Sequence, residues 1–372
     1  MHNIPILDLK KQIRPIRKQI DKSIKEVIDS AEFIFGKPIE ILEKKTSEYC
    51  KVKYAVGVSN CTDALRLALI SLGIKRGDGV ICPAFTFFAT AGAIAAIGAI
   101  PVFTDINPLT YNISLSSIKD AFSRKRNLRI KAVIPVHLYG QCADMDGIVE
   151  FSRRHALKIV EDTAQAFGAE YKGGKAGSFG DCAAVSFFPG KNLGAFGDAG
   201  MVLTNNKRIA DTLLLLRNQG NKHKYNHLIL GFNNRLDTLN AAVLLVKLKY
   251  YDSWNKKRRE NAEYYNKELR GLELQTPFVP SFNKHIYHQY VLRLNSSSRI
   301  LIEHLRHKGI DARVYYPLPL HLQKCFSYLG YHKGDFPESE KASIQTLAIP
   351  VYPDLTMKEK DFVINSIKEF LQ

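Results

Sequence analysis

Short apolar runs alternate with helix-like segments through the middle of the chain. The predicted elements are strands at residues 80–82, 101–104, 131–136 and 157–161 and helices at 88–97, 114–122 and 144–154. A strand that runs parallel to its predecessor needs a long crossover connection, which is usually a helix. The alternation therefore predicts an α/β fold with a mainly parallel sheet covered by helices.

In sheets of this kind, ligands bind where the strands end at their carboxyl edge. Polar, aromatic or glycine-rich segments follow four of the predicted strands, at residues 82–87 (CPAFTF), 136–140 (VHLYG), 161–165 (EDTAQ) and 186–200 (SFFPGKNLGAFGDAG). We expect these four strand exits to converge on one functional edge.

Lys191 lies in the last of these segments, just after the predicted strand 182–187 and the turn-forming pair Pro189 and Gly190. A lysine held in a mostly apolar site loses hydration, so its pKa falls and its neutral amine can attack a carbonyl. Pyridoxal phosphate (PLP) chemistry uses such an amine. The alternative is an ordinary solvated loop lysine, in a chain with 53 Lys and Arg residues.

Two further strand exits fit the same cofactor. Asp162 ends the strand 157–161, where a carboxylate can pair with a protonated pyridine nitrogen, although it can equally cap a following helix. Thr62 follows the strand 54–59 and opens the helix 64–72, so its hydroxyl and the free amides of the helix N-terminus form an anion site. An ordinary N-cap is the alternative there.

The 372 residues, 45% of them hydrophobic, exceed one ordinary core and predict two unequal domains. We assign residues 1–250 to a large cofactor-binding domain with an N-terminal helical arm, and residues 251–372 to a smaller C-terminal α/β domain. A long helical stretch over residues 236–269 connects them.

The cysteines and the apolar segments bear on location. Six cysteines without a Cys-x-x-Cys pair indicate neither a zinc site nor a disulfide framework, and no metal is expected. A proline and charges stand where a signal peptide has its apolar stretch, so we expect a cytoplasmic protein. Residues 80–104 lack charge, but prolines and glycines interrupt them, which argues against a membrane span.

The formal net charge of +17 suits a polyanionic partner, either nucleic acid or a phosphorylated small molecule. The lysines and arginines are spread over the chain, and nothing indicates a DNA-reading helix or an aromatic RNA platform. No nucleic-acid partner is therefore expected.

Seven ordered segments together resemble the sugar aminotransferases of the DegT/DnrJ/EryC1/StrS family, within the fold type I PLP enzymes. The segments are residues 57–65 (GVSNCTDAL), 83–87 (PAFTF), 135–141 (PVHLYGQ), 161–165 (EDTAQ), 186–191 (SFFPGK), 231–237 (GFNNRLD) and 315–321 (YYPLPLH). The resemblance implies a large domain with a mainly parallel seven-stranded sheet flanked by helices, plus a smaller C-terminal α/β domain.

The resemblance also implies roles for individual residues. Lys191 would be the Schiff-base lysine and Asp162 the partner of the pyridine nitrogen. The other cofactor contacts would be Thr62, the Asp63 backbone and Ser186 at the phosphate, Phe87 stacked on the ring, Gln165 at the ring oxygen, and Asn233 at the phosphate of the neighbouring subunit. A homodimer with shared active sites follows from the last of these.

The implied reaction moves an amino group from L-glutamate to a nucleotide-linked keto-sugar, in amino-sugar synthesis for surface polysaccharide. The loop around Lys191 favours a 3-keto substrate over a 4-keto one. The basic and aromatic loops predict Arg235, Tyr315 and His321 as substrate-binding residues. A catalytically inactive PLP-binding regulator and a PLP enzyme acting on free amino acids remain as alternatives.

Overall fold

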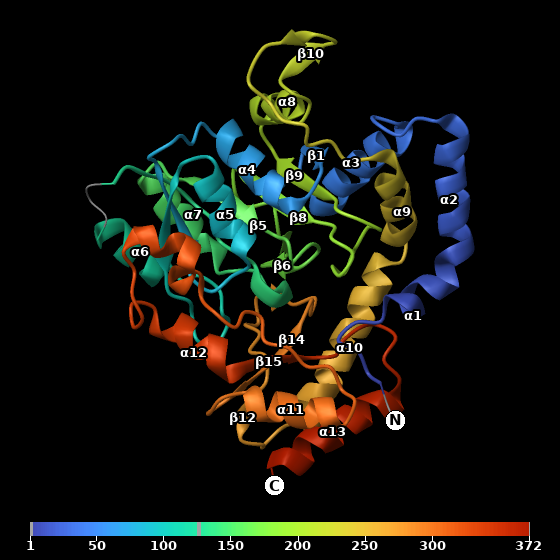
Figure 1. The fold of residues 1–372 in the computed structure, drawn as a ribbon, viewed down its shortest axis with the longest axis vertical. Helices are drawn as coiled ribbons and strands as arrows, with labels where there is room; N and C mark the ends of the chain where they lie inside the picture. Colours follow the sequence, from blue (N-terminus) through green and yellow to red (C-terminus); the bar gives the residue numbers. More distant parts are fainter. Residues whose placement is uncertain (1–2, 125–127, 372) are drawn as a thin grey trace.

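A seven-stranded sheet forms the centre of the computed structural model, which describes residues 3–124 and 128–371 (Figure 1). Its strands, in spatial order, are β1 (Tyr54–Val58), β9 (Gly200–Thr204), β8 (Cys182–Ser186), β5 (Lys158–Asp162), β4 (Ile130–Val133), β2 (Gly79–Pro83) and β3 (Ile100–Thr104). Strand β9 runs antiparallel to both neighbours, and all other pairs are parallel. The predicted mainly parallel α/β sheet is confirmed.

Helices cover both faces of this sheet. They are α4 (Cys61–Ser71), α5 (Phe88–Ala96) and α8 (Lys207–Leu216) on one face, and α6 (Leu115–Arg124) and α7 (Met145–Arg154) on the other. Successive side chains of a strand point to opposite faces. Val80 and Cys82 accordingly enter the core under α4 and α5, whereas Ile81 enters the core under α6 and α7.

The N-terminal arm packs against the helices that leave the sheet. Helices α1 (Leu9–Ile13), α2 (Arg17–Ser30) and α3 (Lys37–Cys50) precede β1, with a 3₁₀ turn between α1 and α2. The predicted helix 236–269 is two helices, α9 (Thr238–Leu248) and α10 (Tyr251–Glu268). Helices α2 and α9 lie side by side in Figure 1 and share a small core with the start of α10.

The C-terminal part forms a second, antiparallel sheet with its own core. This sheet has the order β12 (Leu274–Gln275), β14 (Tyr290–Leu294) and β15 (Thr346–Ile349), and helices α10, α11 (Arg299–His307) and α13 (Met357–Leu371) pack on it. A third small sheet joins β13 (Asn283–Lys284) to β6 (Glu170–Tyr171) and β7 (Gly174–Lys175). The predicted domain boundary at residue 250 stays a prediction.

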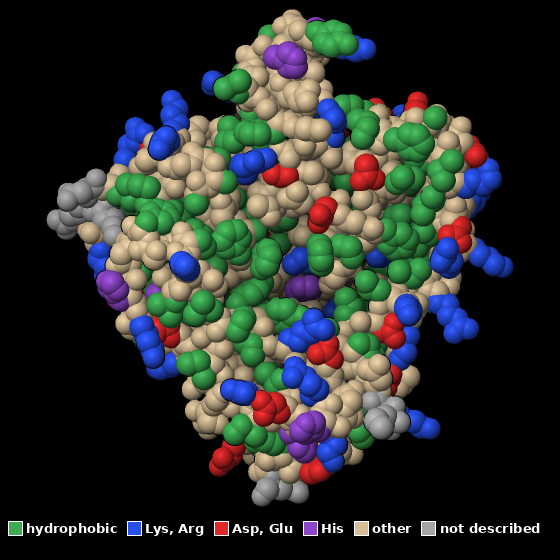
Figure 2. Space-filling model, viewed as in Figure 1, with side chains coloured by type: hydrophobic (Ala, Val, Ile, Leu, Met, Phe, Trp, Pro, Cys, Tyr) green, Lys and Arg blue, Asp and Glu red, His purple; other side chains and the backbone are tan. Residues whose placement is uncertain are grey.

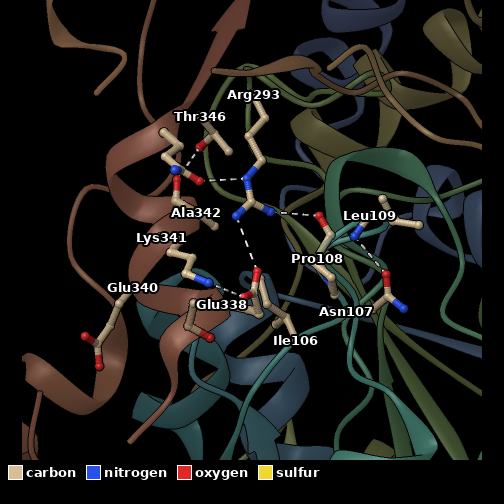
Figure 3. Close-up of polar contacts among 12 residues, drawn as sticks. Ile106, Asn107, Pro108, Leu109, Arg293, Glu338, Glu340, Lys341, Ala342 and Thr346 are labelled. Atoms are coloured by element: carbon tan, nitrogen blue, oxygen red, sulfur yellow. Dashed lines mark hydrogen bonds and ion pairs between the residues drawn. The ribbon is translucent and has the colours of Figure 1, made fainter. Parts of the chain in front are cut away.

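Arg293 of β14 ties this C-terminal sheet to the large sheet (Figure 3). Its guanidinium donates to the carbonyl of Pro108 at 3.0 Å and pairs with Glu338 of α12 (Pro337–Gln345) at 3.3 Å. Pro108 follows β3, whose next residue Asp105 accepts the first amides of α12, those of Glu338 and Ser339, at 2.9 and 2.8 Å. The orientation of the C-terminal part is therefore fixed by charged contacts as well as by packing.

A projecting hairpin lies within residues 218–234, where the sequence predicts only a long polar loop. It consists of β10 (Asn221–His223) and β11 (Asn226–His227) and extends beyond the rest of the molecule (Figure 1). The two backbone segments at the base of the hairpin lie so close together that a Cβ on Gly220 would be 1.7 Å from the Ile229 carbonyl oxygen. The base of the hairpin, which follows α8, is therefore tightly packed.

No helix within residues 3–124 and 128–371 combines the length and the apolar character that a bilayer span requires. The same ranges contain no group of three or more His, Cys, Asp or Glu side chains arranged to hold a metal ion.

Candidate active site

The strand register brings the predicted site residues to one edge of the large sheet. Gly200 of β9 pairs with Val58 at the end of β1 on one side and with Ser186 at the end of β8 on the other. Asp162, the last residue of β5, pairs with Ala184 of β8. The N-terminus of α4, Ser186, the Lys191 loop and Asp162 therefore follow neighbouring strand ends, as the sequence predicts.

The N-terminus of α4 presents free hydrogen-bond donors. The Asn60 side chain caps the helix and accepts the Asp63 amide at 2.8 Å. That amide, predicted to hold a phosphate, already has a partner here. Among the described residues, none accepts a hydrogen bond from the Cys61 or Thr62 amide, and the Thr62 hydroxyl is exposed. These donors and the Ser186 hydroxyl are arranged so that they can bind an anion at the positive end of the helix dipole.

The Asp63 carboxylate stabilises this turn through contacts with four side chains. It accepts hydrogen bonds from the side chains of Ser59, Asn60 and Asn234 and forms an ion pair with Arg66 at 2.7 Å. Asn234 was not predicted as a site residue, because 171 residues separate it from Asp63 in the chain. Arg66 is three residues after Asp63 on α4, but its bond to Asn234 at 2.9 Å spans 168 residues, and it was not predicted either. Their contacts hold the segment that carries Asn233 and Arg235 against the anion site.

Asp162 has a buried carboxylate that accepts one hydrogen bond at each oxygen atom. Its Oδ2 atom accepts from the Thr90 hydroxyl at 2.8 Å, and its Oδ1 atom accepts from the Ala164 amide at 3.2 Å. Thr90 has only one hydroxyl hydrogen, so the 3.0 Å contact with Thr86 must be donated by Thr86. Burial raises the pKa of Asp162, and the bonds from Thr90 and Ala164 oppose that rise.

Glu161, the neighbour of Asp162, is fully buried, and both of its carboxylate oxygens have hydrogen-bond partners. Its carboxylate accepts three backbone amides, those of residues 177, 179 and 180, at 2.7–2.8 Å. It also contacts His137 Nε2 at 2.9 Å. The other ring nitrogen accepts the Ala143 amide, so Nε2 carries the hydrogen and donates to Glu161. This network fixes the end of β5 and so the position of Asp162.

Lys191 occupies a tight turn at the end of β8. Its amide donates to the Phe188 carbonyl at 2.8 Å, and the Ala195 amide closes the loop on Phe187 at 2.7 Å. Burial lowers the pKa of the Lys191 amine, and the nearby Cys61 and Asp162 oppose this shift. The prediction of a desolvated lysine close to Asp162 is consistent with this placement.

Side chains from α9 hold the Lys191 loop from behind. Lys247 is 1% exposed and its ammonium donates to the Gly194 carbonyl, and burial lowers its pKa to about 8. Asn240 accepts the Phe196 amide at 3.0 Å. The loop is therefore anchored at its distal end, and neither anchor was predicted.

Aromatic and amide side chains line the space beside Asp162. Phe87 is 56% exposed and lies 5.9 Å from the ring of Tyr316. Gln165 accepts the Tyr139 amide and donates to the Tyr316 hydroxyl, both at 2.8 Å. Tyr315, the predicted substrate residue, instead contacts Arg313 and accepts the Tyr139 hydroxyl through its carbonyl. Tyr316 is thus the member of the pair that reaches the site.

The remaining predicted residues lie further out. Asn233 is exposed, and Arg235 is half-buried with its Nη1 atom bonded to Asn218 at 3.0 Å. The structure does not bring His321 to Lys191. Its fully buried ring contacts Phe336 and bonds to Glu340 at 3.0 Å, so its predicted contact with substrate gains no support.

This arrangement fits PLP. The unpaired amides of Cys61 and Thr62 suit a phosphate, the buried Asp162 suits a protonated ring nitrogen, and the desolvated Lys191 amine suits the aldehyde. Phe87 is a large ring left uncovered beside them. Each chemical feature of the cofactor therefore has a matching group at this sheet edge.

Comparisons with known proteins agree with this assignment. Residues 14–368 match the DegT/DnrJ/EryC1/StrS aminotransferase family. The chain is 43% identical to a "pleiotropic regulatory protein" of Geobacillus stearothermophilus over 99% of this chain and 98% of the relative. It is 40% identical to a UDP-N-acetyl-3-dehydro-alpha-D-glucosamine 3-aminotransferase of Acidithiobacillus ferrooxidans, over 95% and 94%.

The fold also matches solved structures closely. The crystal structure of DesV from S. venezuelae superposes with a TM-score of 0.96 at 38% identity, covering all of this chain and 99% of DesV. With a family match over nearly the whole length and relatives well above 30% identity, the chain belongs to the DegT/DnrJ/EryC1/StrS aminotransferase family.

Proposed function

We propose that this protein is a PLP-dependent aminotransferase that moves the amino group of L-glutamate to a nucleotide-linked keto-sugar. The observation that carries the proposal is the convergence of Lys191, Asp162 and the open N-terminus of α4 at one sheet edge. Relatives with 36–40% identity are named as transaminases or aminotransferases of nucleotide-linked sugars, which supports the same reaction class.

Bound PLP supplies an electron sink for the carbon that gains or loses the amino group. Asp162 holds a proton at the pyridine nitrogen, and the Thr86–Thr90 relay keeps its carboxylate oriented. The Lys191 amine would hold the aldehyde end of bound PLP, and as a base it would move protons at the substrate carbon. The α4 N-terminus and Ser186 bind the phosphate, and Phe87 and Tyr316 exclude water from the ring.

The residues that lie further from Lys191 are candidates for binding the nucleotide part of the substrate. Arg235 has a buried Nε atom without a hydrogen-bond partner among the described residues, although its Nη1 atom is engaged. A guanidinium in this state can still donate to a diphosphate oxygen. We assign Arg235 to the sugar-nucleotide pocket, favour a 3-keto sugar, and propose that the reaction belongs to the cytoplasmic synthesis of surface polysaccharide.

The name of one relative points to a second candidate function. The Geobacillus stearothermophilus protein is named as a pleiotropic regulator. A regulator that binds PLP without transamination would keep the cofactor site and lose turnover. The intact Lys191, Asp162 and phosphate turn support the enzyme, since regulation alone does not require a desolvated amine beside a buried carboxylate.

The test is a substrate panel. The purified, PLP-loaded protein is mixed with L-glutamate and with UDP-, dTDP- and GDP-linked 3-keto and 4-keto sugars, and mass spectrometry detects the amino-sugar product. We expect amination of a 3-keto member of the panel. Amination of only 4-keto sugars would correct the substrate, and transfer only between free amino acids and keto acids would replace the sugar assignment.

The exposed apolar residues of the hairpin support a proposal about a second copy of this chain. Leu230 is 95% exposed, Tyr225 84% and Leu228 54%. Figure 2 shows hydrophobic side chains on this projecting part, interspersed with His and with Lys or Arg side chains. Exposed apolar residues that cluster on a projecting element are typical of protein–protein contact surfaces. We therefore propose a homodimer in which the hairpin contacts the other subunit and Asn233, near its base, completes that subunit's phosphate site.

Replacing Leu228 and Leu230 by Asp should shift the dimer toward monomer. Each buried leucine contributes about 1.5–3 kcal/mol, so the dissociation constant should rise at least about tenfold for each residue. Sedimentation velocity over a dilution series measures this. Ile300→Asp on α11, also exposed at 64%, is the matched control and should leave the dimer intact. An unchanged dimer in the hairpin variant would place the interface elsewhere.

A further inference from the structure

Asn192, the residue directly after Lys191, is buried where three segments of the chain meet. Its Nδ2 atom lies 2.9 Å from Asn255 Oδ1 on α10 and 3.2 Å from the backbone carbonyl of Ile286. Its Oδ1 atom lies 3.2 Å from His288 Nδ1. One side chain therefore joins the Lys191 loop to α10 and to the segment that leads into β14.

The partners of the Asn192 amide fix its orientation. The Ile286 carbonyl oxygen only accepts hydrogen bonds, so Nδ2 must face it and Oδ1 must face His288, whose Nδ1 atom donates. The two Nδ2 hydrogens are used by the Ile286 carbonyl and by Asn255 Oδ1. Both ends of the buried amide are thus engaged, and truncating the side chain would remove all three contacts at once.

The segment that receives these hydrogen bonds is itself held in place. Arg258, a buried residue of α10, donates from Nη1 to the carbonyls of Tyr287 and His288 at 3.1 and 3.4 Å. The Ile286 amide donates to the Gly140 carbonyl at 2.9 Å. The partners of the amide therefore belong to a fixed part of the structure, so they can hold the loop still.

The position of Asn192 within the loop sets it apart from the other anchors. The two side chains of α9 described above contact the far part of the loop, at Gly194 and Phe196. The Lys191 amide donates to the Phe188 carbonyl, which lies within the same loop. The Asn192 side chain connects the loop to other elements directly beside the reactive amine.

We propose that Asn192 is a positioning residue that ties the backbone beside Lys191 to α10 and to the segment before β14, and so keeps the Lys191 amine in its desolvated position. Asn255 contributes through its bond to Asn192. The placement of the C-terminal part and that of the reactive amine are linked by this side chain. The inference rests on the proposed function only in treating Lys191 as the reactive amine.

The test measures the Lys191 amine in the full-length protein after removal of cofactor. Trace acetylation with acetic anhydride across a pH series, followed by peptide mass spectrometry, gives the pKa of Lys191. The variants are Asn192→Ala, Asn255→Ala and the double variant. Melting temperatures of all variants report the loss of stability that accompanies each change.

Asn261→Ala is the matched control, since Asn261 is also a buried asparagine of α10. Its Nδ2 atom donates to the Tyr352 carbonyl at 2.9 Å, and its Oδ1 atom accepts from Lys360 at 3.1 Å. The control removes a comparable buried amide within the C-terminal part and leaves the Lys191 loop untouched. It should lower the melting temperature without changing the pKa of Lys191.

Burial lowers the pKa of Lys191, so a loop that admits water should let this pKa rise toward its ordinary value. We expect a rise of about one unit in Asn192→Ala and a smaller rise in Asn255→Ala, which removes one of the three contacts. The double variant should show no further rise over Asn192→Ala, because Asn255 acts through the amide that is already gone.

An unchanged Lys191 pKa in Asn192→Ala would overturn the proposal. An equal rise in Asn261→Ala would also overturn it, because the effect would then follow general loss of stability. If Asn192→Ala shows no cooperative melting, Asn255→Ala decides, and an unchanged pKa there is the contradicting result. These measurements use neither substrate nor cofactor, so failure of this inference and failure of the substrate panel are separate outcomes.

Discussion

Lys191→Ala should abolish transamination while leaving the fold intact. The variant loses the amine that holds the cofactor's aldehyde and the base that moves protons at the substrate carbon. General acid–base catalysis alone contributes about 10²–10⁴-fold, so the turnover number should fall by at least that factor. Steady-state amination of the sugar identified in the panel measures the loss, and circular dichroism reports the fold.

Lys207→Ala is the matched control for this variant. Lys207 lies on α8, where its ammonium is exposed and pairs with Asp211 at 2.7 Å. Such surface pairs contribute little, about 0–1 kcal/mol, so this variant should keep full activity. Substantial residual turnover in Lys191→Ala, with Lys207→Ala unaffected, would mean that another amine performs the chemistry.

Asp162→Asn should fold but lose most of its activity. A neutral amide cannot hold a proton on the pyridine nitrogen, so the electron sink weakens. Loss of a charge-assisted hydrogen bond costs about 1.5–3 kcal/mol, which corresponds to at least about ten- to hundredfold in rate. Single-turnover kinetics with L-glutamate isolates the affected half of the reaction.

Thr90→Val separates the charge of Asp162 from its orientation. The variant keeps the carboxylate and removes the hydroxyl that donates to it at 2.8 Å. It should therefore slow the same step less than Asp162→Asn does. Full activity in Asp162→Asn would contradict the role given to this carboxylate.

The sequence was a good guide to features set by local patterns. Alternating apolar strands and helices predicted the parallel sheet because strand and helix periodicities are local properties. Lys191 and Asp162 were predicted as site residues because Asp162 ends one buried strand and Lys191 lies shortly after another, and the carboxyl-edge rule brings such residues together.

Features that depend on distant contacts were missed. Thr90 meets Asp162 across 72 residues, and His288 meets Asn192 across 96, so no local pattern shows either pair. The hairpin was predicted as a loop because its strands are only two and three residues long and lack apolar alternation. Tyr316 rather than Tyr315 faces Gln165. The path of the backbone decides which of the two adjacent tyrosine rings points toward the site, and the residue types alone do not show it.

The most direct test of the central claim is to locate the cofactor on the chain. The PLP-loaded protein is reduced with borohydride and digested, and the peptide that carries the pyridoxyl mass is sequenced by mass spectrometry. We predict a single modified peptide, with the label on Lys191. Label on Lys247 or any other lysine, or protein that binds PLP without a reducible bond to Lys191, would contradict the account.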